Sequence, residues 1–145
     1  MIPNTVSILM VEDDSVERMA IMRAFEIAKI INPVFVAADG IEALEILRHQ
    51  VPGRRLEKPY LVMLDINMPR MNGFEFLAAI KDDPELKDTL VFVLSTSSRD
   101  IERMKANGLN VAGYMVKSTA GDDFKRIVSM LEFHWELVKL LPVDK

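Results

Sequence analysis

The chain has 145 residues, of which 50% are apolar and 28% are charged, and its net charge is −4. This length fits one domain that spans residues 1–145, and the negative balance without a basic block argues against a nucleic-acid partner. The absence of cysteine excludes disulfides and thiolate chemistry. Residues 1–10 lack a leader's charged start and cleavage site, and their apolar run is too short to span a bilayer, so we expect a cytoplasmic protein without membrane contact.

The first predicted strand, residues 6–11, is almost wholly apolar and ends in three consecutive acidic residues. Asp14 and Glu17 match the D-x-x-E pattern, in which a capping carboxylate and a later glutamate close the first turn of a helix. Apolar residues then recur from Ile21 at i, i+3, i+4 and i+7. This spacing gives the first helix one buried face.

A second strand is predicted at residues 34–37, and the D-x-x-E pattern repeats at Asp39 and Glu42. A polar loop at residues 51–59 leads to the third strand. That strand, residues 61–64, is apolar throughout, which is typical of a strand buried on both faces of a parallel sheet.

Asp65 follows the third strand directly, at the edge where open α/β sheets bind ligands. Pro69 and Gly73 then allow a sharp turn into a helix predicted at residues 73–80. The alternative for Asp65 taken alone is an ordinary turn or cap residue, because aspartate often follows a strand.

The fourth predicted strand, residues 90–94, ends in a run of hydroxyl side chains. A helix is predicted at residues 97–108 and a fifth strand at residues 111–116. Lys117 follows that strand, and the last helix is predicted at residues 119–141.

Five apolar strands that alternate with helices predict a doubly wound α/β fold with a parallel sheet covered on both faces. The pattern alone does not give the strand order. Because the carboxyl ends of parallel strands meet at one edge, we expect the polar residues after the strands to converge there. These candidate site residues are Glu12, Asp13, Asp65, Ser95, Thr96 and Lys117.

Three carboxylates at one site repel one another, and a hard divalent cation relieves that repulsion. Oxygen ligands without histidine or cysteine select Mg²⁺ over zinc or copper. A lysine and a hydroxyl beside a metal-bound carboxylate complement a transferred phosphoryl group. No Walker-type phosphate loop occurs, so an aspartate that forms an aspartyl phosphate is the economical interpretation. Each residue also has an ordinary explanation as a cap, a turn or a solvated end.

Four motifs occur in order along the chain: Val11-Glu12-Asp13, Leu64-Asp65-x-Asn67-Met-Pro-x-Met-Asn-Gly73, Leu94-Ser95 and Gly113-Tyr114-x-x-Lys117. Together they resemble the receiver domain of two-component response regulators, over about residues 5–130. The resemblance implies a flavodoxin-like (βα)5 fold with the strand order 2-1-3-4-5. It also implies that Asp65 accepts a phosphoryl group from the phosphohistidine of a sensor histidine kinase.

The same resemblance implies a role for each remaining acidic residue. Asp13 and Asp65 would bind Mg²⁺ directly, together with the backbone carbonyl of Asn67. Glu12 would act on the cation through a water molecule.

Lys117 would pair with a phosphoryl oxygen, Ser95 would be the switch hydroxyl, and Tyr114 would be the aromatic side chain that turns inward when Ser95 moves. Two positions depart from the family pattern. Ser118 follows Lys117 where the family usually has a cis proline, and a cis bond to serine costs about 3 kcal/mol, so we expect a trans bond or strain. Thr96 stands where the family often has alanine or glycine, which would narrow access to the phosphoryl group.

The last predicted helix is extended and carries more apolar surface than one core face needs. Its second apolar stripe predicts a homodimer interface formed by Met130, Phe133, Leu137 and Leu140. The alternative is a broad core face with a frayed end. The tail, Phe133-His-Trp135 through Leu141-Pro142, together with the Ser95-Thr96-Ser97 run, is similar to that of single-domain regulators paired with bacterial phytochrome kinases. We expect no output domain after Lys145, so that the signal leaves through a protein contact, a changed dimer or onward phosphotransfer.

Two other functions compete with this interpretation. A phosphatase of the haloacid-dehalogenase type also uses a strand-end aspartate, Mg²⁺ and a lysine, but it needs a second acid two residues after the nucleophile, where this chain has Asn67. A receiver fold kept only as a dimerisation scaffold would not need the intact set of acids, hydroxyl and lysine.

Overall fold

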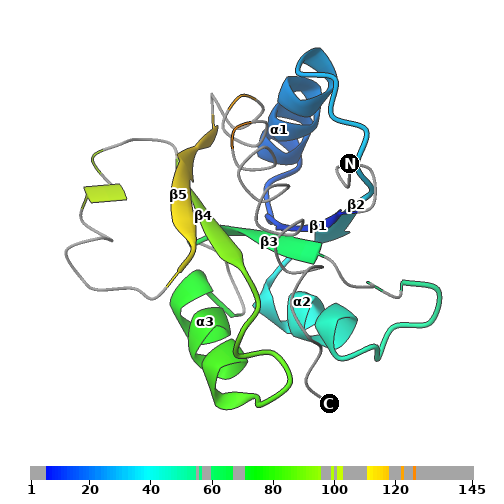
Figure 1. The fold of residues 1–145 in the computed structure, drawn as a ribbon, viewed down its shortest axis with the longest axis vertical. Coiled ribbons are helices and arrows are strands. Elements are labelled where there is room, and N and C mark those ends of the chain that lie inside the picture. The colour runs from blue at the N-terminus through cyan, green and yellow to red at the C-terminus, as the bar shows by residue number, and fades with distance from the viewer. Residues whose placement is uncertain are drawn as a thin grey trace, which may run out of the picture.

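The computed structural model describes residues 6–54, 56, 60–66, 71–95, 99, 101–102, 111–117, 122 and 126. At its centre is a five-stranded parallel sheet with the order β2-β1-β3-β4-β5 (Figure 1). The strands are β1 (Ser7–Val11), β2 (Val34–Ala37), β3 (Tyr60–Asp65), β4 (Val91–Ser95) and β5 (Gly113–Val116). The doubly wound flavodoxin-like fold and the strand order implied by the resemblance are therefore confirmed.

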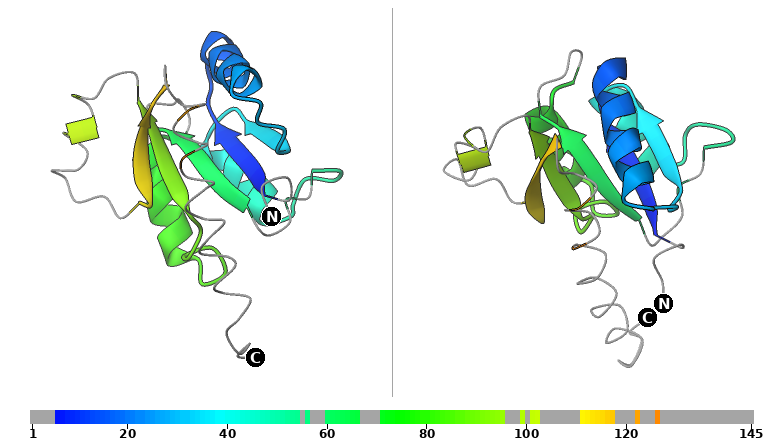
Figure 2. Two further views of the ribbon diagram at one scale, coloured as in Figure 1. Left: turned by 45° about the horizontal axis from the view of Figure 1, so that its top comes forward. Right: turned by 90° about the horizontal axis from the view of Figure 1, so that it is seen from above.

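Helices cover both faces of this sheet. Within the described residues they are α1 (Ser15–Ile27), α2 (Gly40–Leu47) and α3 (Gly73–Asp82). Figure 2 shows α1 on one face and α2 and α3 on the other. No helix in this part of the chain has both the length and the apolar composition that crossing a membrane requires.

The strand side chains alternate between two hydrophobic cores, as the pleat of a strand requires. On the α1 face, Ile21 and Phe25 pack with Met10 and Met63 of the strands. On the other face, α2 and α3 pack against the intervening strand residues, which include Leu9, Val11, Val62, Leu64, Val91 and Val93. Because both faces are buried, the strands are continuously apolar, and this is the pattern visible in the sequence.

The helix starts are fixed by local capping. At α3, Asn72 Oδ1 accepts from the Glu75 N–H and Glu75 Oε1 accepts from the Asn72 N–H, both at 3.0 Å. At α1, Asp14 Oδ1 accepts from the N–H groups of Val16 and Glu17. The Glu17 carboxylate, however, does not close the predicted box, because it pairs with Lys117 instead. The prediction for α1 is right about the cap residue and wrong about its glutamate.

The sheet order places the carboxyl ends of four strands next to one another. In the register, Val11 of β1 lies beside Leu64 of β3, and Asp65 lies beside Leu94 of β4. Ser95 of β4 in turn lies beside Val116 of β5. The residues that follow these strands therefore meet at one edge of the sheet, as predicted from the parallel arrangement.

The two helices predicted after β4 and β5 lie largely outside the described residues. Within them, Arg99, Ile101, Glu102, Asp122 and Arg126 have helical backbone. The four side chains of the predicted dimer stripe, and the expected length of the last helix, also lie outside the described part of the chain.

Gly73 allows α3 to start against the end of β3. Its N–H donates to the Ile66 carbonyl at 2.9 Å, and a Cβ at this position would lie 2.6 Å from Ile66 Cα. We therefore expect Gly73→Ala to lower the free energy of unfolding by about 2 kcal/mol, since the neighbour is backbone and has little room to move.

Urea unfolding checks this prediction, with Gly53→Asn as the control. Gly53 has a φ of +76°, which asparagine tolerates, and a Cβ there meets nothing within 4 Å. Equal stability of the two variants would contradict the close approach at Gly73.

Candidate functional site

Three carboxylates gather at the edge formed by β1 and β3. Ligand oxygens of Glu12, Asp13 and Asp65 lie within 4.8 Å of one another. The side chains differ in exposure: Asp13 is exposed, whereas Glu12 and Asp65 are only 1% and 7% exposed. The structure thus brings together the three acidic residues that the sequence predicted, and two of them, Glu12 and Asp65, are buried.

Lys117, which follows β5, supplies positive charge to this cluster. Its Nζ lies 2.7 Å from Glu12 Oε1 and 3.8 Å from Asp65 Oδ2. It also forms an ion pair with Glu17 from the first turn of α1. Glu17 was expected only as a capping residue, and among the described residues it is a member of the site that the sequence pattern did not predict. The signal that would have found it is its position one turn after the acidic run.

These charges change the proton affinity of the buried groups. Burial raises the pKa of Glu12 from 4.5 to about 7, and the nearby Asp65 adds to the rise, while Lys117 opposes it. For Lys117, burial alone would lower the pKa, but the hydrogen bonds to Glu12 and Glu17 outweigh burial, so the pKa is raised. Lys117 therefore stays protonated and cationic at neutral pH.

The donor set fits a hard divalent cation. Glu12 Oε1 is buried, and its close polar neighbour within the described residues is the Lys117 ammonium at 2.7 Å. The Glu12, Asp13 and Asp65 side chains offer only oxygen, which suits Mg²⁺ or Mn²⁺ better than softer metals. Asn67, whose carbonyl was expected to complete the set, lies outside the described residues.

Ser95 and Tyr114 lie on the opposite face of the sheet from the helix α1. Ser95 ends β4 and is 6% exposed. It shares a strand face with Val91 and Val93, which belong to the core beneath α2 and α3, and Tyr114 packs against the same core. The predicted switch pair therefore shares one face. Thr96 and Ser118 lie outside the described residues, and with them the bond between Lys117 and Ser118.

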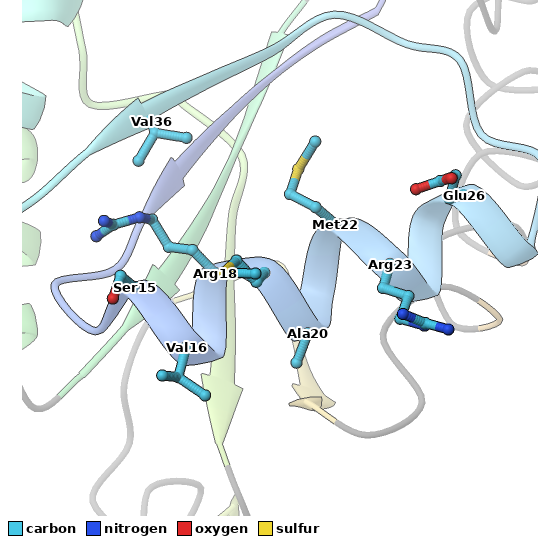
Figure 3. Close-up of a pocket in the computed structure, with 9 residues that line it drawn as sticks. Ser15, Val16, Arg18, Ala20, Met22, Arg23, Glu26 and Val36 are labelled. Atoms are coloured by element: carbon cyan, nitrogen blue, oxygen red, sulfur yellow. The ribbon is translucent and has the colours of Figure 1, made fainter.

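A surface groove of about 680 Å³ lies apart from this chemistry. It runs between α1 and the edge strand β2, and Figure 3 shows Arg18 and Met22 extending from α1 on the side of Val36. None of the clustered acids lines it. One lining residue does touch the site: Arg18 Nη1 donates to the Glu12 carbonyl at 2.8 Å and so braces the backbone at the end of β1.

Comparison with known proteins identifies the class. The family description "Response regulator receiver domain" matches residues 8–129, so the chain belongs to the response regulator receiver family. The protein FilR2 of Methanothrix harundinacea, described as a probable methanogenesis regulatory protein, is 37% identical over 88% of this chain and 82% of its own length. Response regulator Rcp1 of Synechocystis sp. is 31% identical over 93% of this chain and 92% of its own length.

Solved structures agree with this assignment. The bacteriophytochrome response regulator AtBRR superimposes with a TM-score of 0.75 at 29% identity, over 85% of this chain and 89% of its own. The phosphorylated cyanobacterial phytochrome response regulator RcpA gives 0.65 at 32% identity, over 96% and 98% of the two chains. The Mn²⁺-bound form of Rcp1 gives 0.63 at 29% identity, over 96% and 99%. The resemblance to phytochrome-associated response regulators is therefore confirmed.

The raised pKa of Glu12 predicts a pH-dependent affinity for Mg²⁺. In the metal-free folded protein, Glu12 keeps its proton between its ordinary pKa of 4.5 and about 7. A protonated carboxyl binds a cation poorly, so the affinity should rise as the pH increases through about 7, with release of a proton on binding.

Titration calorimetry at about pH 6 and about pH 8 measures this change. Glu12→Gln is the matched control, because it removes the titrating group and keeps the shape, and its affinity should vary less with pH. An affinity that varies equally in both proteins would contradict the role of Glu12.

Proposed function

We propose that this protein is a phosphoacceptor response regulator in which Asp65 receives a phosphoryl group from the phosphohistidine of a sensor histidine kinase. The observation that supports this most directly is the position of a partly buried lysine beside a buried aspartate. Lys117 Nζ lies 3.8 Å from Asp65 Oδ2, within the cluster that also contains Glu12 and Asp13. A carboxylate nucleophile, a fixed cation and further acids form a set suited to phosphoryl transfer.

The transfer follows from these groups. An Asp65 oxygen attacks phosphorus as the bond between phosphorus and the histidine nitrogen breaks, and the histidine keeps that electron pair. Lys117 donates hydrogen bonds to a phosphoryl oxygen, where negative charge must be offset. Low exposure of Asp65 limits its hydration, so the nucleophile has less water to shed before it attacks.

The cation is proposed to be Mg²⁺, held directly by Asp13, Asp65 and the Asn67 carbonyl, and by Glu12 through water. When bound, Mg²⁺ would offset the charge of the phosphoryl oxygens. The oxygen-only donor set supports a hard cation, and the relative Rcp1 is known in a Mn²⁺-bound form.

Ser95 and Thr96 are proposed to respond to the phosphoryl group through their hydroxyls, and Tyr114 to follow. Ser95 and Tyr114 share the face covered by α2 and α3, so a shift of Ser95 toward the phosphoryl group would change the packing next to Tyr114. Such a change gives the phosphorylated protein a different surface, and the difference in contacts between the two states drives the switch.

The donor is proposed to be a kinase of the bacterial phytochrome class, working in the cytoplasm. The similarity to AtBRR and RcpA, both described as phytochrome response regulators, supports this choice.

A phosphatase is the less favoured function because Asn67 stands where haloacid dehalogenases need an acid. The receiver unit is proposed to span residues 1–145, with the core at about residues 5–130.

Phosphorylation by a small donor tests the proposed function. We expect acetyl phosphate and Mg²⁺ to add one phosphoryl group, seen by intact mass, and we expect Asp65→Asn to gain none. Omission of Mg²⁺ should also prevent the adduct. An adduct that persists in Asp65→Asn, or continuous release of phosphate from generic esters, would contradict the proposal.

Thr96→Ala is measured in parallel, and it should be phosphorylated faster than wild type if the Thr96 side chain narrows access to Asp65.

The homodimer is proposed to form through the predicted stripe of Met130, Phe133, Leu137 and Leu140. A charge within an apolar interface is costly, so Phe133→Glu should convert a dimer into a monomer without loss of the folded core. Sedimentation velocity measures the change, with Glu132→Gln as the matched control. A monomeric wild type, or a dimer unaffected by Phe133→Glu, would rule out this interface.

A further inference from the structure

The glutamate in the first turn of α1 behaves differently from its counterparts in α2 and α3. Glu75 closes the capping box of α3 at 3.0 Å, and Glu42 accepts from the Ala38 N–H at 2.6 Å just before α2. Glu17 holds the same helical position in α1, but its carboxylate pairs with Lys117, a residue 100 positions away. In a capping box, Glu17 would accept from the Asp14 N–H. In α1 the Asp14 N–H donates to Glu12 Oε2 instead, at 3.3 Å.

The alternation of the strands explains why Glu17 reaches Lys117. Met10, Met63 and Met115 all point into the core beneath α1. In each of these strand directions, the residue two positions later lies on the same side of the sheet. These residues are Glu12 after β1, Asp65 at the end of β3 and Lys117 after β5, so all three lie toward α1. The first turn of α1 therefore lies beside the acidic cluster, and Glu17 adds a further carboxylate at its rim, with its side chain 33% exposed.

One ammonium is consequently shared among three carboxylates. Glu12 lies 2.7 Å from Lys117 Nζ and Glu17 is in direct contact with it, whereas Asp65 lies at 3.8 Å, beyond hydrogen-bond distance. An ammonium has three N–H donors, so the contacts with Glu12 and Glu17 leave one N–H and determine where the ammonium lies relative to Asp65.

We propose that Glu17 is a positioning residue that holds the Lys117 ammonium toward α1 and thereby sets how firmly Lys117 engages the phosphoryl group at Asp65. This inference rests on the proposed function. During transfer Lys117 has to approach the phosphoryl oxygen closely enough to donate an N–H, and the attraction to the Glu17 carboxylate holds the ammonium back from Asp65. Glu17 thus tunes the rate of phosphorylation without touching the phosphoryl group.

Removal of the competing charge should free the lysine. Glu17→Gln keeps the size of the side chain and its good helix propensity but offers only a neutral amide. We expect its rate of phosphorylation by acetyl phosphate to increase about fivefold, which corresponds to the loss of one partly exposed ion pair.

The matched control is Glu75→Gln, which neutralises the equivalent glutamate of α3 and should leave the rate unchanged. The double-mutant cycle with Lys117→Met separates a role through the lysine from a general charge effect, because Glu17→Gln should then have no effect. Thermal melting of each variant confirms that it is folded. The nitrogen-15 resonance of the Lys117 ammonium gives a second readout: it should shift in Glu17→Gln and stay in place in Glu75→Gln.

The outcomes are distinct. Wild-type protein that takes no phosphoryl group contradicts the proposed function and this inference with it. Wild-type protein that is phosphorylated, with an unchanged or slower rate in Glu17→Gln, overturns the inference alone. An equal acceleration in the Lys117→Met background also overturns it. If phosphorylation of Lys117→Met is too slow to measure, an unshifted Lys117 ammonium resonance in Glu17→Gln would overturn the inference.

Discussion

The site depends on one balance of charge, between the Lys117 ammonium and the carboxylates around it. Glu12 and Asp65 are almost fully buried, and the negative charge of a buried carboxylate is stable only with a cation beside it. Lys117 supplies that cation in the metal-free protein, and it lies closer to Glu12 than to Asp65. Asp65, the proposed nucleophile, therefore lies near the lysine without a close contact to it. A divalent cation and a phosphoryl group would each redistribute the same charges.

The sheet makes this balance possible. The order β2-β1-β3-β4-β5 places β3 between β1 and β4, so that the acidic residues after β1 meet the aspartate of β3. Gly73 then lets α3 begin directly behind Ile66, the residue after that aspartate. Alternation along the strands places Glu12, Asp65 and Lys117 toward α1, while Ser95 and Tyr114 share the other face. The sheet therefore separates the charged groups on the α1 side from the proposed switch residues Ser95 and Tyr114 on the other side.

The sequence predicted the strands well, because strands buried on both faces are written as continuous apolar runs, as in Leu61 to Leu64. It also predicted which residues follow the strands, and hence the cluster of Glu12, Asp13, Asp65 and Lys117. The strand order came only from the family resemblance, since pairing partners leave no local pattern. The partner of Glu17 was missed because the D-x-x-E pattern is purely local, whereas Lys117 approaches only through the folded sheet. The roles of Thr96 and Asn67, and the dimer stripe, remain predictions.

A crystal structure with Mg²⁺ and beryllofluoride, a mimic of the phosphoryl group, would show whether Asp65 and Lys117 act together on a phosphoryl group. We expect beryllium bonded to an Asp65 oxygen, with Mg²⁺ held by Asp65 and Asp13. We also expect Lys117 to turn from the α1 side to donate to a fluorine. Beryllofluoride bound at another residue, or Lys117 still paired only with Glu12 and Glu17 beside an occupied Asp65, would contradict this expectation.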